Sequence, residues 1–274
     1  MANDVAAVVT LPELTNSLDD SLFDNTQVVI FTSYPRSDMG KGHFVGGCLS
    51  NAQDSTAIKF DGLLNTNLDK RHTTIDNDDL GTYMKFRPDK TFNESQYLIG
   101  GDLLFEFIKT YGENEYASFR PHVVLFFLNK IQQIFVNEGK PKYLFIEIGG
   151  TIDDYEVAPF VPPAITYAIK HWGAKVALLS ELHYSDHHFK TKDLQRSIQA
   201  CTEHSITPDY LLLRLPNDRE VAEVSLDTIA ETVSGRLSQT FSADQLFPIP
   251  SFNGDIVDGY KEVTKPFIER LSHE

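Results

Sequence analysis

Residues that could bind and transfer a phosphate group follow an early apolar run of the sequence. Lys41 stands between Gly40 and Gly42, shortly after the run VVIFT at residues 28–32. A lysine between glycines after a strand can reach the β- and γ-phosphates of a nucleotide, while backbone N–H groups hold the phosphate oxygens. The common pattern G-x-x-x-x-G-K-[ST] is not met, because Pro35 and Gly42 occupy two of its fixed positions. The segment is therefore either a variant phosphate loop or an ordinary surface turn.

Carboxylates that could hold a magnesium ion occur at two further places. Glu147 closes the apolar run YLFI, which is how sheets of this kind place a carboxylate beside a phosphate-bound Mg²⁺. The run DNDD, residues 76–79, is a second source, with a solvated acidic loop as the alternative. Asp153 and Asp154 follow a glycine pair and could equally begin a helix, where the dipole favours acidic residues.

Cationic side chains gather in the segment HYSDHHFKTK, residues 183–192. Lys190 and Lys192 would suit an anionic substrate in an acidic protein, although plain surface lysines are the alternative. His183 and His187 have no cysteine or glutamate placed as a further ligand, so we do not expect a zinc site.

The elements that must position these groups alternate between short apolar runs and helical patterns. The helical pattern is clearest at residues 121–139, where Val123, Phe127, Ile131, Ile134 and Phe135 share a face and Gly139 follows as a stop. The alternation predicts an α/β fold with a mostly parallel sheet covered by helices on both faces, in a Rossmann-like, P-loop NTPase-like three-layer arrangement. Ligands then bind beyond the carboxyl ends of the strands. The runs expected to form buried strands are 28–32, 56–61, 143–148, 175–182 and 209–215.

The remaining sequence indicates a single domain. Residues 1–24 are acidic and polar and are expected to form a loosely attached arm, while 25–274 form one domain. Within it, 217–274 are expected to contain a helix, a short strand near LFPIP and a last helix.

Composition narrows the class of protein. The chain has 274 residues, with 24 basic against 39 acidic side chains and a formal net charge of −15, which repels nucleic acids and disfavours anionic membranes. No apolar run approaches the ~20 residues of a membrane helix, and MANDVAAVVTLPELTN lacks the features of a secretory signal, so a cytoplasmic protein is expected. Cys48 and Cys201 fit a reducing compartment and lie in no nucleophile motif.

Taken in order, these stretches resemble the amidoligase (synthetase) domain of CTP synthase. That family has a phosphate loop ending in GKG, a KLD-type motif, DLGHYERF, a PH pair before a long helix, EIGGTVGDIES followed by PF, KTKPTQH and QPDILICR. Here they correspond to Gly40–Gly42, Lys59–Asp61, Asp79–Phe86, Pro121–His122, Glu147–Val157 followed by Pro159 and Phe160, Lys190–Arg196 and Thr207–Arg214. The resemblance covers residues 27–214, and EIGGT with a downstream KTK is its specific part.

The resemblance implies a chemistry and a set of site residues. In such enzymes ATP phosphorylates a carbonyl oxygen of a pyrimidine nucleotide, and ammonia then displaces phosphate. Carried over by position, Lys41 and Lys59 would be catalytic, and Asp79 and Glu147 would hold Mg²⁺. The ATP-binding residues would be Ser37, Asp38, Met39, Gly40, Lys41, Gly42, His43 and Arg214. An anionic, nucleotide-like acceptor would bind to Asp154, Glu156, Lys190, Lys192 and Gln195. The resemblance also implies a homo-oligomer, either a dimer or a tetramer.

The chain departs from the family pattern in places that concern function. Ser33 and Tyr34 stand where the family has two glycines, and Pro35 and Arg36 replace small apolar residues. The family's SP-x-QHGE segment is missing, its His after DLG is Thr82, and the Gly-Glu before its KTK is His187 and His188.

These departures leave the nitrogen source and the function class open. No glutaminase nucleophile loop of the GxCxGxQ type is present in these 274 residues, so ammonia is free, supplied by a separate glutaminase, or replaced by another amine. Two further functions stay open: a carboxylate ligase resembling dethiobiotin synthetase, and a non-catalytic nucleotide-binding paralogue.

Overall fold

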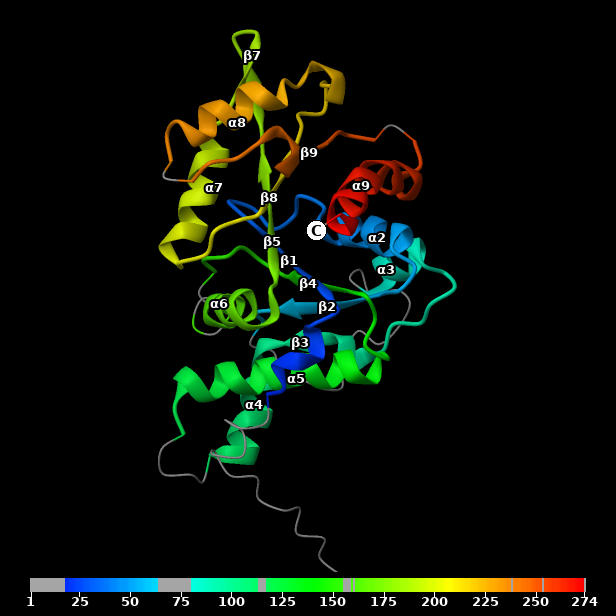
Figure 1. Ribbon diagram of the computed structural model, residues 1–274, viewed down its shortest axis with the longest axis vertical. Helices are drawn as coiled ribbons and strands as arrows, with labels where there is room; N and C mark the ends of the chain where they lie inside the picture. The colour runs from blue at the N-terminus through cyan, green and yellow to red at the C-terminus, as the bar shows by residue number, and fades with distance from the viewer. Residues whose placement is uncertain are drawn as a thin grey trace, which may run out of the picture.

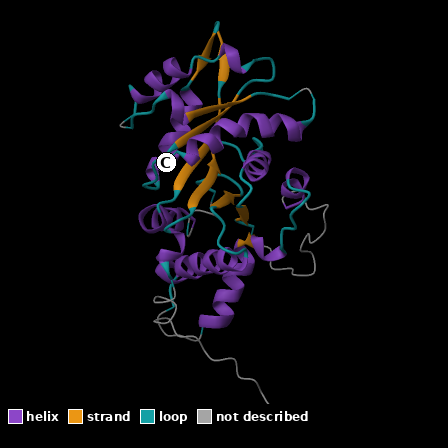
Figure 2. Ribbon diagram, turned by 45° about the vertical axis from the view of Figure 1, so that its right-hand side comes forward, coloured by secondary structure: helices purple, strands orange, loops and turns teal. Residues whose placement is uncertain are grey.

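A parallel sheet forms the centre of the molecule. The computed structural model describes residues 18–63, 80–112, 117–154, 159, 161–237, 239–252 and 254–273. Within these ranges seven strands pair in the order β3-β2-β4-β1-β5-β8-β9, and every neighbouring pair in this sheet is parallel. The strands are β1 (Gln27–Ser33), β2 (Ser55–Asp61), β3 (Tyr97–Ile99), β4 (Tyr143–Ile148), β5 (Lys175–Glu181), β8 (Tyr210–Arg214) and β9 (Leu246–Ile249). Figures 1 and 2 show helices on both sides of the sheet.

Side chains alternate across the sheet and build a separate core on each face. Val28 and Ile30 of β1 lie in one cluster of buried side chains, and Val29 and Phe31 lie in the other. This period of two is what a strand buried on both faces requires, and it explains why the strand sequences are continuous apolar runs. The predicted three-layer α/β fold is therefore confirmed.

Helices close the two cores. One face is covered by α2 (Lys41–Asn51), α3 (Leu80–Phe86) and α9 (Ile256–Ser272), which supply Phe44, Tyr83 and Phe267 to their core. Shorter turns connect the larger elements: η1 (Asp20–Phe23), η3 (Glu94–Gln96), η4 (Phe119–Val123), η5 (Val221–Glu223) and η6 (Ala243–Gln245). The other face carries α4 (Gly100–Tyr111), α5 (Val124–Asn137), α6 (Val161–Trp172), α7 (Lys192–Glu203) and α8 (Leu226–Ser234).

The predicted elements are found with small differences at their ends. All five expected strands and the strand near LFPIP are present, and the helix expected at 121–139 is α5, preceded by the π-helical turn η4. Gly139 follows α5 with a positive φ of 84°, as a helix stop requires. The short strand β3 and the hairpin of β6 (His183–Ser185) and β7 (His188–Lys190) were not predicted, because three residues are too few to show a period.

The start of the described chain packs against the domain. Residues 1–17 of the expected arm lie outside the described ranges. From there on, Phe23 is buried and stacks between Phe135 and Trp172, with ring centroids at 4.7 and 4.3 Å. The Asp20 carboxylate accepts a hydrogen bond of 2.8 Å from the indole N–H of Trp172. Residues 20–23 therefore belong to the packed body of the protein.

No helix within the described ranges is both long and apolar enough to cross a membrane.

Candidate functional site

The segment predicted to hold ATP phosphates runs from the end of β1 to the start of α2. Gly40, immediately before α2, has a left-handed φ of 91°. A Cβ atom at Gly40 would lie 2.3 Å from the hydroxyl oxygen of Tyr260 on α9. The backbone angle and the close approach of α9 thus both require glycine at this position.

Lys41 begins α2 and turns its side chain inward. Its ammonium donates to Ser33 Oγ at 2.7 Å and to the carbonyl oxygen of Gly150 at 2.6 Å. The residue is 3% exposed. Burial is the main reason that the pKa of Lys41 falls to about 7, because removing water disfavours the charged form. The hydrogen bonds of Lys41 therefore connect the end of β1 to the EIGGT segment. Its amine changes protonation near neutral pH.

Glu147 lies beside Lys41 and has two direct partners. Sheet register places Lys59 opposite Glu147 across the β2–β4 pair. The Lys59 ammonium contacts Glu147 Oε1 at 2.7 Å, and the Tyr83 hydroxyl donates to Oε2 at 2.5 Å. All three side chains are buried. The arrangement is a desolvated carboxylate held between a cation and a phenol at the carboxyl ends of β2 and β4.

The charge of Glu147 is maintained by its neighbours. Burial alone would raise the pKa of this carboxyl, but the charges of Lys59 and Lys41, together with the hydrogen bonds from Lys59 and Tyr83, lower it below its ordinary value. Glu147 is therefore ionised at neutral pH, although it is desolvated.

The glycine pair after β4 allows close packing at the same edge. Asp61 Oδ1 occupies the space where a Cβ atom on Gly149 would lie. The other carboxylate oxygen, Oδ2, accepts a hydrogen bond of 2.8 Å from the Tyr97 hydroxyl. Gly149 is thus needed so that the ends of β2 and β4 can approach each other.

Three of the other residues expected to bind ATP line a neighbouring cavity of about 350 Å³. Asp38, Met39 and Arg214 contribute to its lining, at the carboxyl ends of β5 and β8. Arg36 lines the same cavity and is bound by the carboxylates of Asp38 and Glu181, at 2.9 and 3.5 Å. Ser37 is exposed in the loop.

Arg214 and His43 both contact the C-terminal helix. The Arg214 guanidinium donates to the Tyr260 hydroxyl at 3.3 Å and to the carbonyl oxygen of Pro250 at 3.2 Å. The His43 ring stacks on the Tyr260 ring with centroids 5.4 Å apart, and burial lowers the pKa of His43. Gly42 lies close to Glu147, the candidate metal ligand, since a Cβ atom on Gly42 would be 3.4 Å from Glu147 Oε2. Helix α9 thus supports the side chains around the loop between β1 and α2.

Of the other acidic residues expected in the acceptor and metal sites, the structure describes Asp154 but not Asp79 or Glu156. Asp154 receives hydrogen bonds from the Thr151 backbone N–H at 2.6 Å and from the Thr151 hydroxyl at 2.8 Å, so it stabilises its own loop. Asp79 and Glu156 lie outside the described residues. Among the residues that the structure does describe, no group of three or more His, Cys, Asp or Glu side chains is placed to hold a metal ion.

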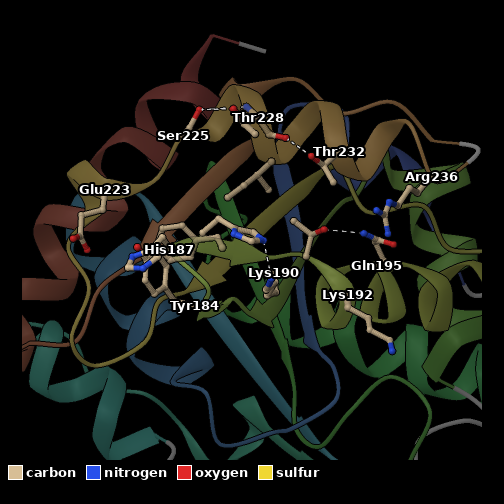
Figure 3. Close-up of a pocket in the computed structure, with 14 residues that line it drawn as sticks. Tyr184, His187, Lys190, Lys192, Gln195, Glu223, Ser225, Thr228, Thr232 and Arg236 are labelled. Carbon is tan, nitrogen blue, oxygen red and sulfur yellow. Dashed lines mark hydrogen bonds between the residues drawn. The ribbon is translucent and has the colours of Figure 1, made fainter.

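The remaining acceptor candidates line a second cavity. Lys190, Lys192 and Gln195 border a pocket of about 540 Å³ between the β6–β7 hairpin, the start of α7 and helix α8. Figure 3 shows these side chains together with Arg236, which was not predicted. This pocket and the Lys41–Glu147 cluster share no lining residue, so the residues expected to act on ATP and on the acceptor fall into two adjoining groups.

Helix α7 connects the two groups. Ser197 Oγ donates to the carbonyl oxygen of Tyr34 at 2.8 Å, in the first half of the loop between β1 and α2. It also lies 2.8 Å from Ser180 Oγ on β5. The helix that carries Lys192 and Gln195 is therefore attached to the loop that carries Lys41.

Three residues of these groups were missed by sequence reasoning. Tyr83 could have been found, because it lies within DLGTYMKF and a buried tyrosine needs a hydrogen-bond partner. Tyr260 and Arg236 could not, since each reaches the site from a distant element and neither lies in a recognised motif.

Comparison with known proteins identifies a family. The family described as CTP synthase N-terminus matches residues 70–251, a range that includes Glu147 and the KTK segment but neither Lys41 nor Lys59. CTP synthases from Sulfolobus acidocaldarius and Caldivirga maquilingensis are each 28% identical, over 71% and 82% of this chain. The chain spans only 41% and 45% of the lengths of those relatives. Among solved structures, the cell division protein MinD of Aquifex aeolicus aligns over 91% of the chain and 98% of its own, with 12% identity and a TM-score of 0.46.

Proposed function

The chain belongs to the CTP synthase N-terminus family, and from that membership we propose that it is a ligase that uses ATP and Mg²⁺ to aminate an anionic, nucleotide-like acceptor. Residues 25–274 would form the amidoligase domain. In the proposed reaction the acceptor's carbonyl or carboxyl oxygen attacks the γ-phosphorus of ATP, the bond to the β-phosphate oxygen breaks, and ADP leaves. Ammonia then attacks the activated carbon, and phosphate departs with the acceptor oxygen.

The observation that carries this proposal is the buried group of Lys41, Glu147 and Lys59 at the carboxyl ends of three adjacent strands. Phosphoryl transfer depends on positioning and on stabilisation of spread negative charge, so two desolvated cations beside a phosphate loop suit it better than a nucleophile would. In this proposal Lys41 contacts the phosphates of ATP, and Lys59 stabilises the phosphoryl group in transit.

The donor set at Glu147 fits magnesium. This carboxylate offers hard oxygen ligands, and Mg²⁺ is commonly held by one or two carboxylates together with substrate phosphates rather than by a full protein cage. Glu147 and Asp79 would hold the ion, which when bound neutralises charge on the phosphate oxygens. Lys59 would then exchange part of its contact with Glu147 for the transferred phosphoryl group.

Several parts of the proposal rest on the relatives. The acceptor would bind at Lys190, Lys192 and Gln195, and ammonia would come from solution or from a separate glutaminase. We also propose that the chain forms a dimer or a tetramer and works in the cytoplasm, where ATP is available. Mass measured in solution by light scattering would test the oligomer, and a monomer at micromolar concentration would contradict it.

Acceptor-dependent phosphate release tests the function. The protein is incubated with ATP, Mg²⁺, ammonium and a panel of nucleotides, and released phosphate is measured. We expect release to require one acceptor, and Lys41→Ala or Glu147→Ala to reduce it at least about a hundredfold, as for removal of one charge-stabilising group. Lys265→Met, an exposed change on α9, should leave the rate unchanged. Normal ATP binding without release for any acceptor would reject the enzyme.

A non-catalytic nucleotide-binding protein is the second candidate. It is favoured by the contacts of Lys41, which is held by Ser33 where the family has glycine. In that case ATP would bind without being consumed, and the Glu147→Ala variant would bind it with little change in affinity once Mg²⁺ is omitted.

A further inference from the structure

Ser33 is the last residue of β1, and its side chain is fully buried. Its hydroxyl oxygen accepts a hydrogen bond of 2.7 Å from the Lys41 ammonium and donates one of 3.2 Å to the carbonyl oxygen of Gly150. The same carbonyl oxygen accepts a hydrogen bond of 2.6 Å from Lys41. Ser33, Lys41 and Gly150 therefore form a closed triangle of hydrogen bonds beyond the carboxyl ends of β1 and β4.

The backbone around Ser33 fixes the position of this hydroxyl. The Ser33 carbonyl oxygen accepts a hydrogen bond of 3.2 Å from the Ile152 N–H of the EIGGT segment. The next residue, Tyr34, donates its N–H to the Leu179 carbonyl oxygen on β5 at 3.2 Å. Ser33 is thus held from both sides and cannot follow the Lys41 side chain if that side chain moves.

The triangle leaves Lys41 little surface for a ligand. The residue is 3% exposed, so its ammonium cannot contact a phosphate oxygen unless the side chain or its surroundings move. Both of its present acceptors are neutral, whereas a phosphate oxygen is charged and makes the stronger hydrogen bond to an ammonium. A bound triphosphate would therefore draw Lys41 away from Ser33, and the lost hydrogen bond would subtract from the affinity. The family pattern has glycine in place of Ser33, and glycine has no hydroxyl to lose.

We propose that Ser33 is a positioning residue that competes with the phosphates of ATP for the Lys41 ammonium and so weakens the binding of ATP. The inference rests on the proposed function, because it takes Lys41 to be the lysine that contacts those phosphates. It gives a role to a residue by which this chain departs from its family, since the hydroxyl holds the lysine between the first strand and the EIGGT segment.

Binding of a non-hydrolysable ATP analogue with Mg²⁺ tests the inference. The dissociation constant is measured by calorimetry at pH 6, where Lys41, whose pKa is about 7, is mostly charged. We expect Ser33→Ala to bind the analogue about tenfold more tightly, as for removal of a competing hydrogen bond to a charged group. Ser33→Cys should have an intermediate affinity, since a thiol is a weak hydrogen-bond acceptor. If Ser33 had only a structural role, its loss would weaken binding or leave it unchanged.

Two further variants separate this effect from a general change in β1. Thr32→Val removes the neighbouring hydroxyl, which is buried and has no hydrogen-bond partner among the described residues, and should change affinity less than about twofold. In a Lys41→Met background, where the ammonium is gone, Ser33→Ala should neither restore nor tighten binding. A gain of the same size in that background would show that Ser33 acts independently of Lys41 and would overturn the inference. Unfolding in urea shows that each variant is folded.

The outcomes separate this inference from the proposed function. Equal or weaker binding by folded Ser33→Ala, with the wild type binding the analogue, overturns the inference and leaves the proposed reaction unaffected. Tighter binding by Ser33→Ala without phosphate release for any acceptor supports the inference and rejects the enzyme. An analogue that binds to neither protein rejects the ATP site itself, and the inference with it.

Discussion

In the proposed ATP site, the protonation of Lys41 would respond to a bound phosphate. Its pKa is about 7 in the protein against an ordinary 10.5, because burial disfavours the charged form. At pH 8.5 most Lys41 side chains are thus neutral. A triphosphate beside the amine favours the ammonium and raises this pKa, so binding at that pH must take up a proton.

We expect close to one proton to be taken up when an ATP analogue binds at pH 8.5, and less at pH 6, where Lys41 is already charged. Calorimetry in buffers of different ionisation enthalpy measures this number. Lys41→Met should abolish the difference between the two pH values. Equal proton uptake by wild type and variant would show that Lys41 does not contact the phosphates of the ATP analogue.

Tyr83 satisfies one oxygen of a buried carboxylate. Tyr83→Phe leaves Glu147 Oε2 without the phenol, and a buried acceptor that loses its donor costs about 1–3 kcal/mol. We expect the free energy of unfolding in urea to fall by that amount. Tyr143→Phe is the control, because that hydroxyl shares a hydrogen bond of 3.0 Å with the neutral Ser272 hydroxyl, so its loss should be smaller. Equal losses for the two variants would contradict a charged Glu147.

At the scale of elements, the position of α2 depends on its contact with α9. A Cβ atom on Gly47 would lie 2.7 Å from the Tyr260 carbonyl oxygen and 2.6 Å from Thr264 Oγ1. The Tyr260 carbonyl oxygen is a backbone atom and cannot move without moving α9. The Tyr260 side chain on the same helix lies beside the loop that precedes α2. The glycine is thus required for the approach of the two helices.

Gly47→Ala should therefore lower the free energy of unfolding by about 1–3 kcal/mol, despite the better helix propensity of alanine. It should also weaken ATP-analogue binding, because α2 carries Lys41. Ser50→Ala, half-buried on the same helix, is the control and should affect neither quantity. An unchanged free energy of unfolding in Gly47→Ala would show that α2 and α9 are not in close contact at Gly47.

The segment at Phe23 is a second element whose packing can be tested. Its ring lies between Phe135 and Trp172, so Phe23→Ala should cost about 3–5 kcal/mol of unfolding free energy. Trp172 is the single tryptophan, and its fluorescence should shift to longer wavelength as water reaches it. Leu22→Ala, half-buried beside it, should cost less and leave the emission in place. An unshifted spectrum in Phe23→Ala would mean that the segment does not cover the indole.

Over the whole molecule, the sequence predicted the sheet better than the sites. The strands were found because burial on both faces makes them continuous apolar runs, as in β1 and β4. The Lys59–Glu147 pair depends on strand register, which an apolar run does not specify. Tyr260 and Arg236 reach their sites from α9 and from the end of α8, and such long-range contacts leave no local signal.

The net charge of −15 limits where the molecule can bind anionic ligands. The molecule as a whole repels phosphorylated ligands, so the proposed ligands would have to be held by local cations, such as Lys41 and Lys59 in one group and Lys192 and Arg236 in the lining of the second pocket. Two cationic groups joined through α7 are what the proposed reaction between ATP and an anionic acceptor would need.

Isotope transfer from acceptor to phosphate tests the central claim most directly. In the proposed reaction the acceptor's carbonyl oxygen leaves with the phosphoryl group when ammonia takes its place. With UTP and related nucleotides labelled with ¹⁸O at the carbonyl, in the presence of ATP, Mg²⁺ and ammonium, we expect each released phosphate to carry one labelled oxygen. ATP turnover that yields unlabelled phosphate, or no turnover with any acceptor, would contradict the account.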